Sequence, residues 1–217
     1  MRSFWRPAAV TSCLFLLGIA SAASAGSPES SLPPFGRDTV LVWKVQIQEE
    51  DTREFVVRIA EFLPDRFLEW EDATTQGTIF MPNRALTSAK IFVNASLFEG
   101  GVDTKGKDKT TLWLSQQIYR DLKAKQRLKL SLDSVDGWFT VEGTDQITVE
   151  VNRAQMNLPV LNVKDDRGSL RSFLDFESNP LMVRHTVRTF SQTLTSITTD
   201  RPNTLRWIKG KKLTNPH

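Results

Sequence analysis

Alternation of apolar and polar residues with a period of two is the feature that most restricts how this chain can fold. In residues 41–47, Leu41, Trp43 and Val45 alternate with mostly polar neighbours, so that one face of the segment can be buried. The same alternation recurs in three later segments, at 55–59, 128–132 and 147–151. This pattern is typical of strands in a sheet that has one buried face.

Turn residues, and not long helical stretches, separate the other strand candidates. We predict these strands at 66–71, 77–81, 89–93, 138–142, 158–163, 170–175, 181–189 and 192–199. The segments 133–137 and 165–168 combine Asp and Gly, which favour chain reversal. Many short strands with hairpin-length connections predict a mainly β fold, either a single antiparallel barrel or a strongly curved sheet.

One segment, at about 114–125, breaks the alternation. Leu114, Ile118 and Leu122 are spaced four residues apart and would share one face of a helix. Ser115 can cap the start of that helix. A helix of about three turns is marginal in water by itself. We therefore expect one short helix that packs on the sheet.

The first 25 residues have the three parts of a secretory signal peptide. Arg2 and Arg6 provide a basic start, residues 14–20 an apolar centre, and residues 23–25 a small-residue A-x-A end. We expect cleavage after Ala25 and export to the periplasm or the extracellular space of a bacterium. No transmembrane segment is expected in the mature chain.

A retained membrane anchor and a lipoprotein acylated at Cys13 are the alternatives to a cleaved signal. Thr11, Ser12 and Ser21 interrupt the apolar stretch, which is then short for a span of roughly 20 residues. The apolar run also follows Cys13, whereas in a lipoprotein it precedes the acylated cysteine. Cleavage is therefore the favoured interpretation.

The rest of the chain is expected to form a single domain. Residues 26–36 are rich in Ser, Pro and Gly and predict a flexible lead-in. Residues 37–200 would form the β-rich domain, and residues 201–217 a basic tail. The cationic side chains of this tail would either be solvated or contact an anionic polymer.

Charge and cysteine content exclude several functional classes. Two of the 28 Lys and Arg residues lie in the signal segment, and the others nearly balance the 25 Asp and Glu residues. The mature chain is therefore nearly neutral, which gives no reason to expect that it binds nucleic acid. The single Cys13 lies there as well. A cysteine nucleophile, a Cys-ligated zinc and a redox role are thus excluded, and we expect no cofactor or metal.

Three residues are candidates for ligand contact: Trp43, Trp70 and His185. Tryptophan rings can line an apolar ligand cavity. His185 alternates in phase with Leu181 and Val183, which favours a core histidine over a general base. No G-x-S-x-G motif accompanies it, so we assign no catalytic residue.

Two stretches carry a resemblance to a known family. They are 111–123, and a discontinuous set made of 158–161, Gly168, 173–175 and 179–181. They resemble exported bacterial proteins of acidobacterial type that form a family of unknown function. The resemblance covers about a third of the chain. It implies a periplasmic β-rich fold and supplies no catalytic residues.

Together these observations favour a non-enzymatic exported protein that holds an apolar or amphipathic ligand between the sheet and the short helix. Its partner would be a lipid-like small molecule. The alternative is a structural or adaptor protein of the cell envelope, with a filled core and an envelope protein as partner. A hydrolase that uses His185 is the third hypothesis.

Overall fold

The structure is a computed structural model that describes residues 33–47, 51–94, 97–98, 100–101, 103–132 and 135–199. The predicted signal peptide with its cleavage site at Ala25, residues 26–32 of the lead-in and the basic tail at 201–217 lie outside the described residues.

The described residues form one thirteen-stranded sheet and two helices. The strands are β1 (Val40–Ile47), β2 (Asp51–Glu61), β3 (Arg66–Glu71), β4 (Gln76–Met81), β5 (Ile91–Phe92), β6 (Asp103–Lys105), β7 (Lys109–Thr110), β8 (Arg127–Leu132), β9 (Val135–Val151), β10 (Ala154–Asp165), β11 (Leu170–Leu174), β12 (Met182–Val187) and β13 (Phe190–Thr198). The helices are α1 (Asn83–Ser88) and α2 (Gln116–Lys125). The predicted mainly β fold is therefore confirmed.

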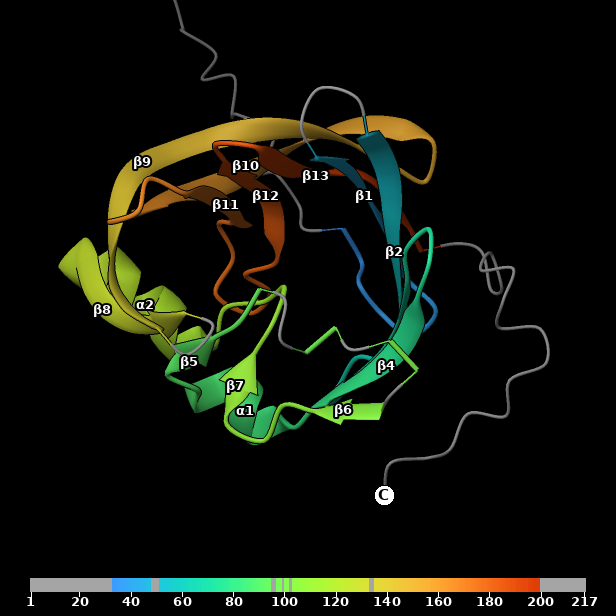
Figure 1. Ribbon diagram of the computed structural model, residues 1–217, viewed down its shortest axis with the longest axis horizontal. Coiled ribbons are helices and arrows are strands. Elements are labelled where there is room, and N and C mark those ends of the chain that lie inside the picture. The colour runs from blue at the N-terminus through green and yellow to red at the C-terminus, as the bar shows by residue number, and fades with distance from the viewer. Residues whose placement is uncertain are drawn as a thin grey trace, which may run out of the picture.

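The sheet curves into a ring, which Figure 1 shows in cross-section. Its strand order is β6-β4-β3-β2-β1-β13-β12-β11-β10-β9-β8-β5-β7. The long strands pair antiparallel, whereas β4–β6, β5–β7, β5–β8 and a second contact of β13 with β9 are parallel. β6 and β7 occupy opposite ends of the strand order but are separated by only three residues, 106–108, so the chain itself joins the two ends.

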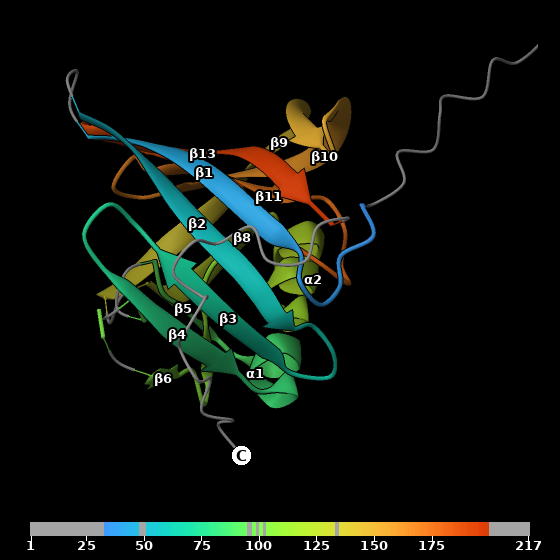
Figure 2. The same cartoon turned by 90° about the vertical axis from the view of Figure 1, so that its right-hand side faces the viewer.

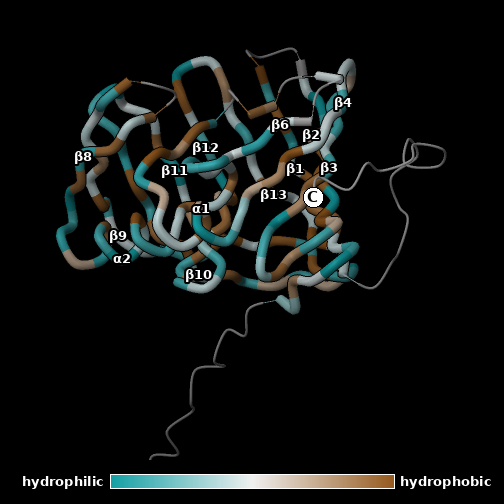
Figure 3. The backbone as a smooth tube through the Cα atoms, turned by 90° about the horizontal axis from the view of Figure 1, so that it is seen from below, coloured by the Kyte–Doolittle hydropathy of each residue, from teal (hydrophilic) through white to brown (hydrophobic). Residues whose placement is uncertain are grey.

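Alternating burial along the strands follows the period-two pattern. In β1, Leu41 and Trp43 are buried while Lys44 and Gln46 are exposed. In Figure 3, hydrophobic and hydrophilic segments follow one another along the tube. The long neighbours β1 to β4 cross one side of the molecule in Figure 2. Their buried faces therefore contribute one wall of the interior.

The helix α2 is capped as the sequence predicts. The Ser115 hydroxyl accepts a hydrogen bond from the Ile118 amide at 3.1 Å, and Gln126 ends the helix in a left-handed conformation. Ile118 and Leu122 are buried against the sheet. Tyr119 donates a hydrogen bond of 2.5 Å to Asp175, the residue that follows β11. This bond links the helix to the end of β11.

The short strand β6 was not predicted, and two further elements differ from the sequence expectation. The six-residue helix α1 is additional to the single predicted helix. The strands predicted at 138–142 and around 147–151 are parts of one strand, β9, which has 17 residues. β9 stays continuous because β10 pairs with it along nearly its whole length, with a register shift between Asn162 and Val163.

Large side chains fill the interior of the ring. The largest fully buried ones include three tryptophans and three phenylalanines: Trp43, Trp70, Trp113, Phe92, Phe139 and Phe173. Burying each such side chain contributes roughly 1.5–3 kcal/mol to folding. The sheet therefore encloses a packed core. Neither helix is long and apolar enough to cross a membrane, among the residues that the structure describes.

Candidate ligand-binding site

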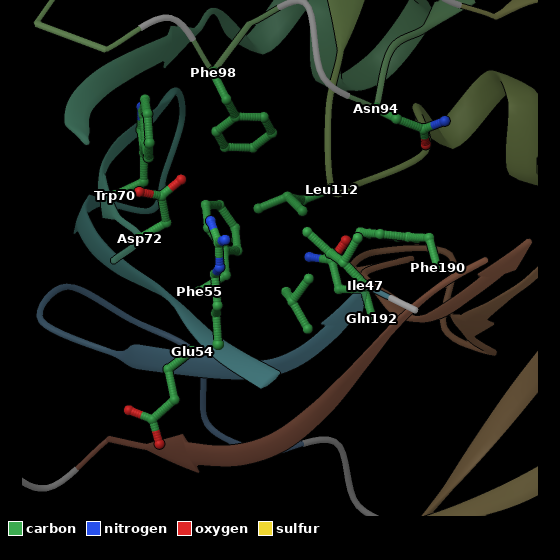
Figure 4. Close-up of a pocket in the computed structure, with 12 residues that line it drawn as sticks. Ile47, Glu54, Phe55, Trp70, Asp72, Asn94, Phe98, Leu112, Phe190 and Gln192 are labelled. Carbon is green, nitrogen blue, oxygen red and sulfur yellow. The ribbon is translucent and has the colours of Figure 1, made fainter. Parts of the chain in front are cut away.

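A pocket of about 290 Å³ opens at one end of the sheet ring (Figure 4). Its lining comes from the last residues of β1, the first of β2 and β13, the end of β3, and the connections around Asn94, Phe98 and Leu112. The volume lies near the lower end of the roughly 300–1,000 Å³ that is usual for small-molecule sites. Ile47, at the mouth, is 39% exposed although it is apolar.

Three aromatic rings form one wall of the pocket. The ring of Phe98 meets Phe55 at 5.1 Å and Trp70 at 5.4 Å between centroids, in both cases edge to face. Phe55 and Trp70 are 6.1 Å apart. Phe55 on β2 and Trp70 on β3 reach the same face because Trp70 is in register with Val57, two residues from Phe55. We call these three residues the aromatic wall.

A glycine on the neighbouring strand makes room for the indole of Trp70. Gly77 of β4 is the register partner of Trp70. A Cβ at position 77 would lie 2.9 Å from Trp70 Nε1 and 3.0 Å from its Cε2. Such distances are too short for ordinary contact, so a side chain at 77 would displace the indole. Gly77 therefore determines where the aromatic wall stands.

The opposite side of the pocket carries two amide side chains among apolar residues, of which Phe190 is one (Figure 4). Gln192 of β13 lines it with only 9% of its surface exposed, and its side-chain amide has no hydrogen bond with the described residues. Asn94 also lines it, and its Oδ1 accepts a long hydrogen bond of 3.5 Å from Arg171 Nε. His185 on β12 is in register with Gln192, so the two side chains are neighbours on one face. We call Gln192 and Asn94 the polar wall.

His185 lies behind the polar wall in a buried charged cluster. Arg171 Nη1 donates a 2.9 Å hydrogen bond to Asp165 Oδ2, and both side chains are almost completely buried. Burial, and after it the positive charge of Arg171, lower the pKa of His185 to about 4, although Asp165 opposes the shift. The imidazole is therefore neutral near pH 7. Its Nε2 has no hydrogen-bond partner within the described ranges.

Asp72, at the rim, is engaged by its own turn. Burial alone would raise the pKa of its carboxyl, but hydrogen bonds from the backbone and hydroxyls of Thr74 and Thr75 lower it overall. The backbone bonds measure 2.8 Å and 2.7 Å. This carboxylate therefore stabilises the connection between β3 and β4.

The structure separates the three predicted contact residues. Trp70 lines the pocket. Trp43 is fully buried behind it, meets Phe55 at 5.8 Å, and donates its indole N–H to the Met182 carbonyl at 3.2 Å. His185 lies on the other side, behind Gln192. The helix α2 does not contribute to this pocket, which therefore differs in place from the predicted site between sheet and helix.

The sequence did not point to four residues of the two walls: Phe55, Phe98, Asn94 and Gln192. Phe55 carried a signal, since it alternates in phase with the apolar residues of 55–59. Phe98 lies outside the named strands and helices, where no periodic pattern exists. Gln192 carries no signal in the sequence, because only the register of β12 with β13 places it beside the buried His185.

No group of three or more His, Cys, Asp or Glu that could hold a metal ion occurs among the described residues. The chain matches no protein-family model, no curated protein and no solved structure.

Proposed function

We propose that this protein is a non-enzymatic binding protein for a small apolar or amphipathic molecule, which occupies the pocket between the aromatic wall and the polar wall. The observation that carries the proposal is a pocket of about 290 Å³ whose aromatic side chains are brought together from two strands and a connection. Concave sites with mainly apolar walls and few polar groups are typical of small-molecule binding.

Export is part of the proposal. It is supported by the basic, apolar and small-residue parts of residues 1–25 and by the resemblance of two stretches to exported bacterial proteins of acidobacterial type. Expression in a bacterium followed by intact-mass measurement of the periplasmic fraction tests it. A mature chain that begins at Gly26 supports export, and a full-length chain confined to the cytoplasm contradicts it.

Binding is tested with naphthalene, an apolar probe without hydrogen-bonding groups. Isothermal titration should show saturable one-to-one binding to the purified protein. Phe98→Ala removes one ring of the aromatic wall and should weaken binding at least about tenfold, because an aromatic contact and its buried area are lost.

Phe62→Ala is the matched control. Phe62 lies in the connection from β2 to β3, at the end of these strands away from the pocket, and stacks on Phe35 with 6.1 Å between the ring centroids. That variant should bind naphthalene with unchanged affinity. Thermal unfolding of both variants shows whether they remain folded. Absence of saturable binding to the wild type, or equal losses in the two variants, would refute the proposed site.

An adaptor of the cell envelope is the second candidate. The packed interior favours it, together with exposed apolar side chains at Val135 and Trp138. Trp138 is 41% exposed and lies under the guanidinium of Arg127 at 4.4 Å. A protein that binds no naphthalene but loses an envelope partner on Trp138→Ala would support this function instead.

A further inference from the structure

We propose that the pocket selects a molecule with an apolar body and an uncharged hydrogen-bonding head, a hydroxyl or a carbonyl, and that the head is bound by the Gln192 side chain. The inference rests on the proposed function, because it names the ligand class of the same pocket.

The two walls give the pocket a direction. In Figure 4, Phe55, Trp70 and Phe98 gather on one side, while Gln192 and Asn94 lie on the other. The pairing agrees with the picture: β1 separates β2 from β13, so Phe55 and Gln192 approach the space from different strands. A ligand therefore meets the aromatic wall at one end, and at the other end the two amide groups beside Phe190 (Figure 4).

Gln192 is the residue with unused hydrogen-bonding capacity. Its amide carries two donors and one acceptor, yet it makes no hydrogen bond with the described residues while being nine-tenths buried. Neither amide atom of Gln192 is among the fully buried, unpartnered polar atoms of the described residues, so the amide is open to the pocket that it lines. His185 Nε2, its neighbour across the β12–β13 pair, is also buried and without a partner. A ligand hydroxyl or carbonyl placed here would satisfy the amide.

The charges around this wall are already neutralised, which favours an uncharged head. Arg171 is paired with Asp165 at 2.9 Å, and it also approaches Asn94. His185 is neutral near pH 7, as its environment shows. An ionised head would lose its hydration without gaining a counter-charge, which is costly in a buried site.

The charged residues of the lining lie on the other side of the pocket. Arg53 and Glu54 belong to β2, and Asp72 to the connection that follows β3. Figure 4 shows the Glu54 carboxylate directed away from the aromatic wall. Asp72 is engaged by Thr74 and Thr75. Arg53 is the nearest of the three to Gln192 in register, since Val45 of β1 pairs with both, and Arg53 is already engaged in an interaction of its own.

Three matched probes test the inference: naphthalene, 2-naphthol and 2-naphthoate, which share one ring system and differ in the head. For the wild type, titration calorimetry should give 2-naphthol an affinity about fivefold above that of naphthalene, the gain expected from one net hydrogen bond. The anionic 2-naphthoate should bind more weakly than naphthalene.

Gln192→Leu keeps a side chain of similar size and removes the amide. In this variant the preference for 2-naphthol should fall from about fivefold to about one, while naphthalene still binds. The matched control is Gln155→Leu, an exposed glutamine on β10, which should keep the preference.

The results distinguish the two proposals. If naphthalene does not bind the wild type, the proposed function fails. If naphthalene binds but 2-naphthol gains nothing, or if the gain survives in Gln192→Leu, only the assignment of the head is overturned. A tighter affinity for 2-naphthoate than for 2-naphthol would contradict the uncharged head.

Discussion

The two ends of strands β2 and β3 carry aromatic clusters that are completed in different ways. At one end, which we call the filled end, the guanidinium of Arg66 lies over Trp113 at 4.4 Å and over Phe62 at 4.9 Å. At the other end, which we call the open end, the aromatic wall borders the pocket of about 290 Å³. The chain supplies its own cation to one cluster and leaves space beside the other.

An aromatic cluster in this fold therefore does not by itself indicate a ligand site. Trp113 at the filled end donates its indole N–H to Asn179 Oδ1 at 2.6 Å, and Arg66 donates to the same oxygen at 3.1 Å. At the filled end, the chain itself therefore supplies the groups that contact the rings. At the open end, a ligand would have to supply them. Changes at the open end should therefore alter ligand binding, and changes at the filled end should leave ligand binding unaltered.

Arg58→Met is expected to have the largest effect. Arg58, on β2, donates to Glu69 at 2.6 Å and also bonds Asp38. Its removal leaves the fully buried Glu69 carboxylate without its counter-charge, so the free energy of unfolding should fall by about 3–5 kcal/mol. Urea denaturation measures this loss.

Lys129→Met is the control for Arg58→Met, because its ion pair with Asp136 is exposed on both sides. The control should lose less than about 1 kcal/mol. Equal losses in the two variants would mean that burial of the Glu69 ion pair does not contribute to stability.

The pH dependence of stability should follow His185. Its folded-state pKa is about 4, below the ordinary 6.5, because it is buried and faces Arg171, an effect that Asp165 only partly offsets. The unfolded chain therefore binds the proton first as pH falls. The contribution is fully present above pH 6.5 and is lost between pH 6.5 and 4, by about 3 kcal/mol.

Urea denaturation of the wild type and of His185→Gln at pH 7 and pH 4 checks this dependence. The variant lacks the titrating group, so its free energy of unfolding should fall less on acidification by about 3 kcal/mol. Parallel declines in both proteins would show that His185 is not a buried neutral imidazole.

Gly77→Ala should damage the open end in particular. The added Cβ would come within 3.0 Å of the Trp70 indole, so the ring must shift. We expect a loss of about 1–3 kcal/mol in the free energy of unfolding and a weaker affinity for naphthalene. Gly36→Ala is the control, since a Cβ there meets nothing within 4 Å. An unchanged affinity of Gly77→Ala for naphthalene would show that the Trp70 indole does not take part in binding.

Arg66→Met should have the smallest effect. Burial lowers the pKa of Arg66 to about 9, and no carboxylate pairs with it within the described part of the chain. Replacing a buried cation that has no carboxylate partner by an apolar side chain of similar size removes a desolvation cost. This gain should offset the lost contacts with Asn179 and the two rings, so the free energy of unfolding should change by less than about 1 kcal/mol. Naphthalene affinity should not change. A loss like that of Arg58→Met would contradict the comparison of the two arginines.

Local patterns predicted most of the strands and the helix α2, because each of these elements alternates or repeats over several residues. The helix α1 lacks such signals: Pro82 provides no side-chain cap, and no basic residue stands in its last turn. β9 was expected as two strands because residues 143–146 carry no apolar alternation. Pairing with β10 makes it one strand, and that is a tertiary effect.

The candidate site could be predicted only in part, since it is assembled by register. Trp70 was identified from its residue type, which suits an apolar cavity. The position of its indole depends on Gly77 across the β3–β4 pair, and the polar wall depends on the pairing of His185 with Gln192. Neither relation is visible in the linear order of residues.

The most direct test of the ligand site at the open end is a ¹H–¹⁵N NMR titration of the tryptophan indole signals with 2-naphthol. Trp70 lines the pocket, Trp113 belongs to the filled end, and Trp138 is on the surface. The Trp70 signal should shift saturably, while the signals of Trp113 and Trp138 stay in place. A shift of Trp113 or Trp138 without Trp70, or no saturable shift at all, would contradict a ligand site at the open end.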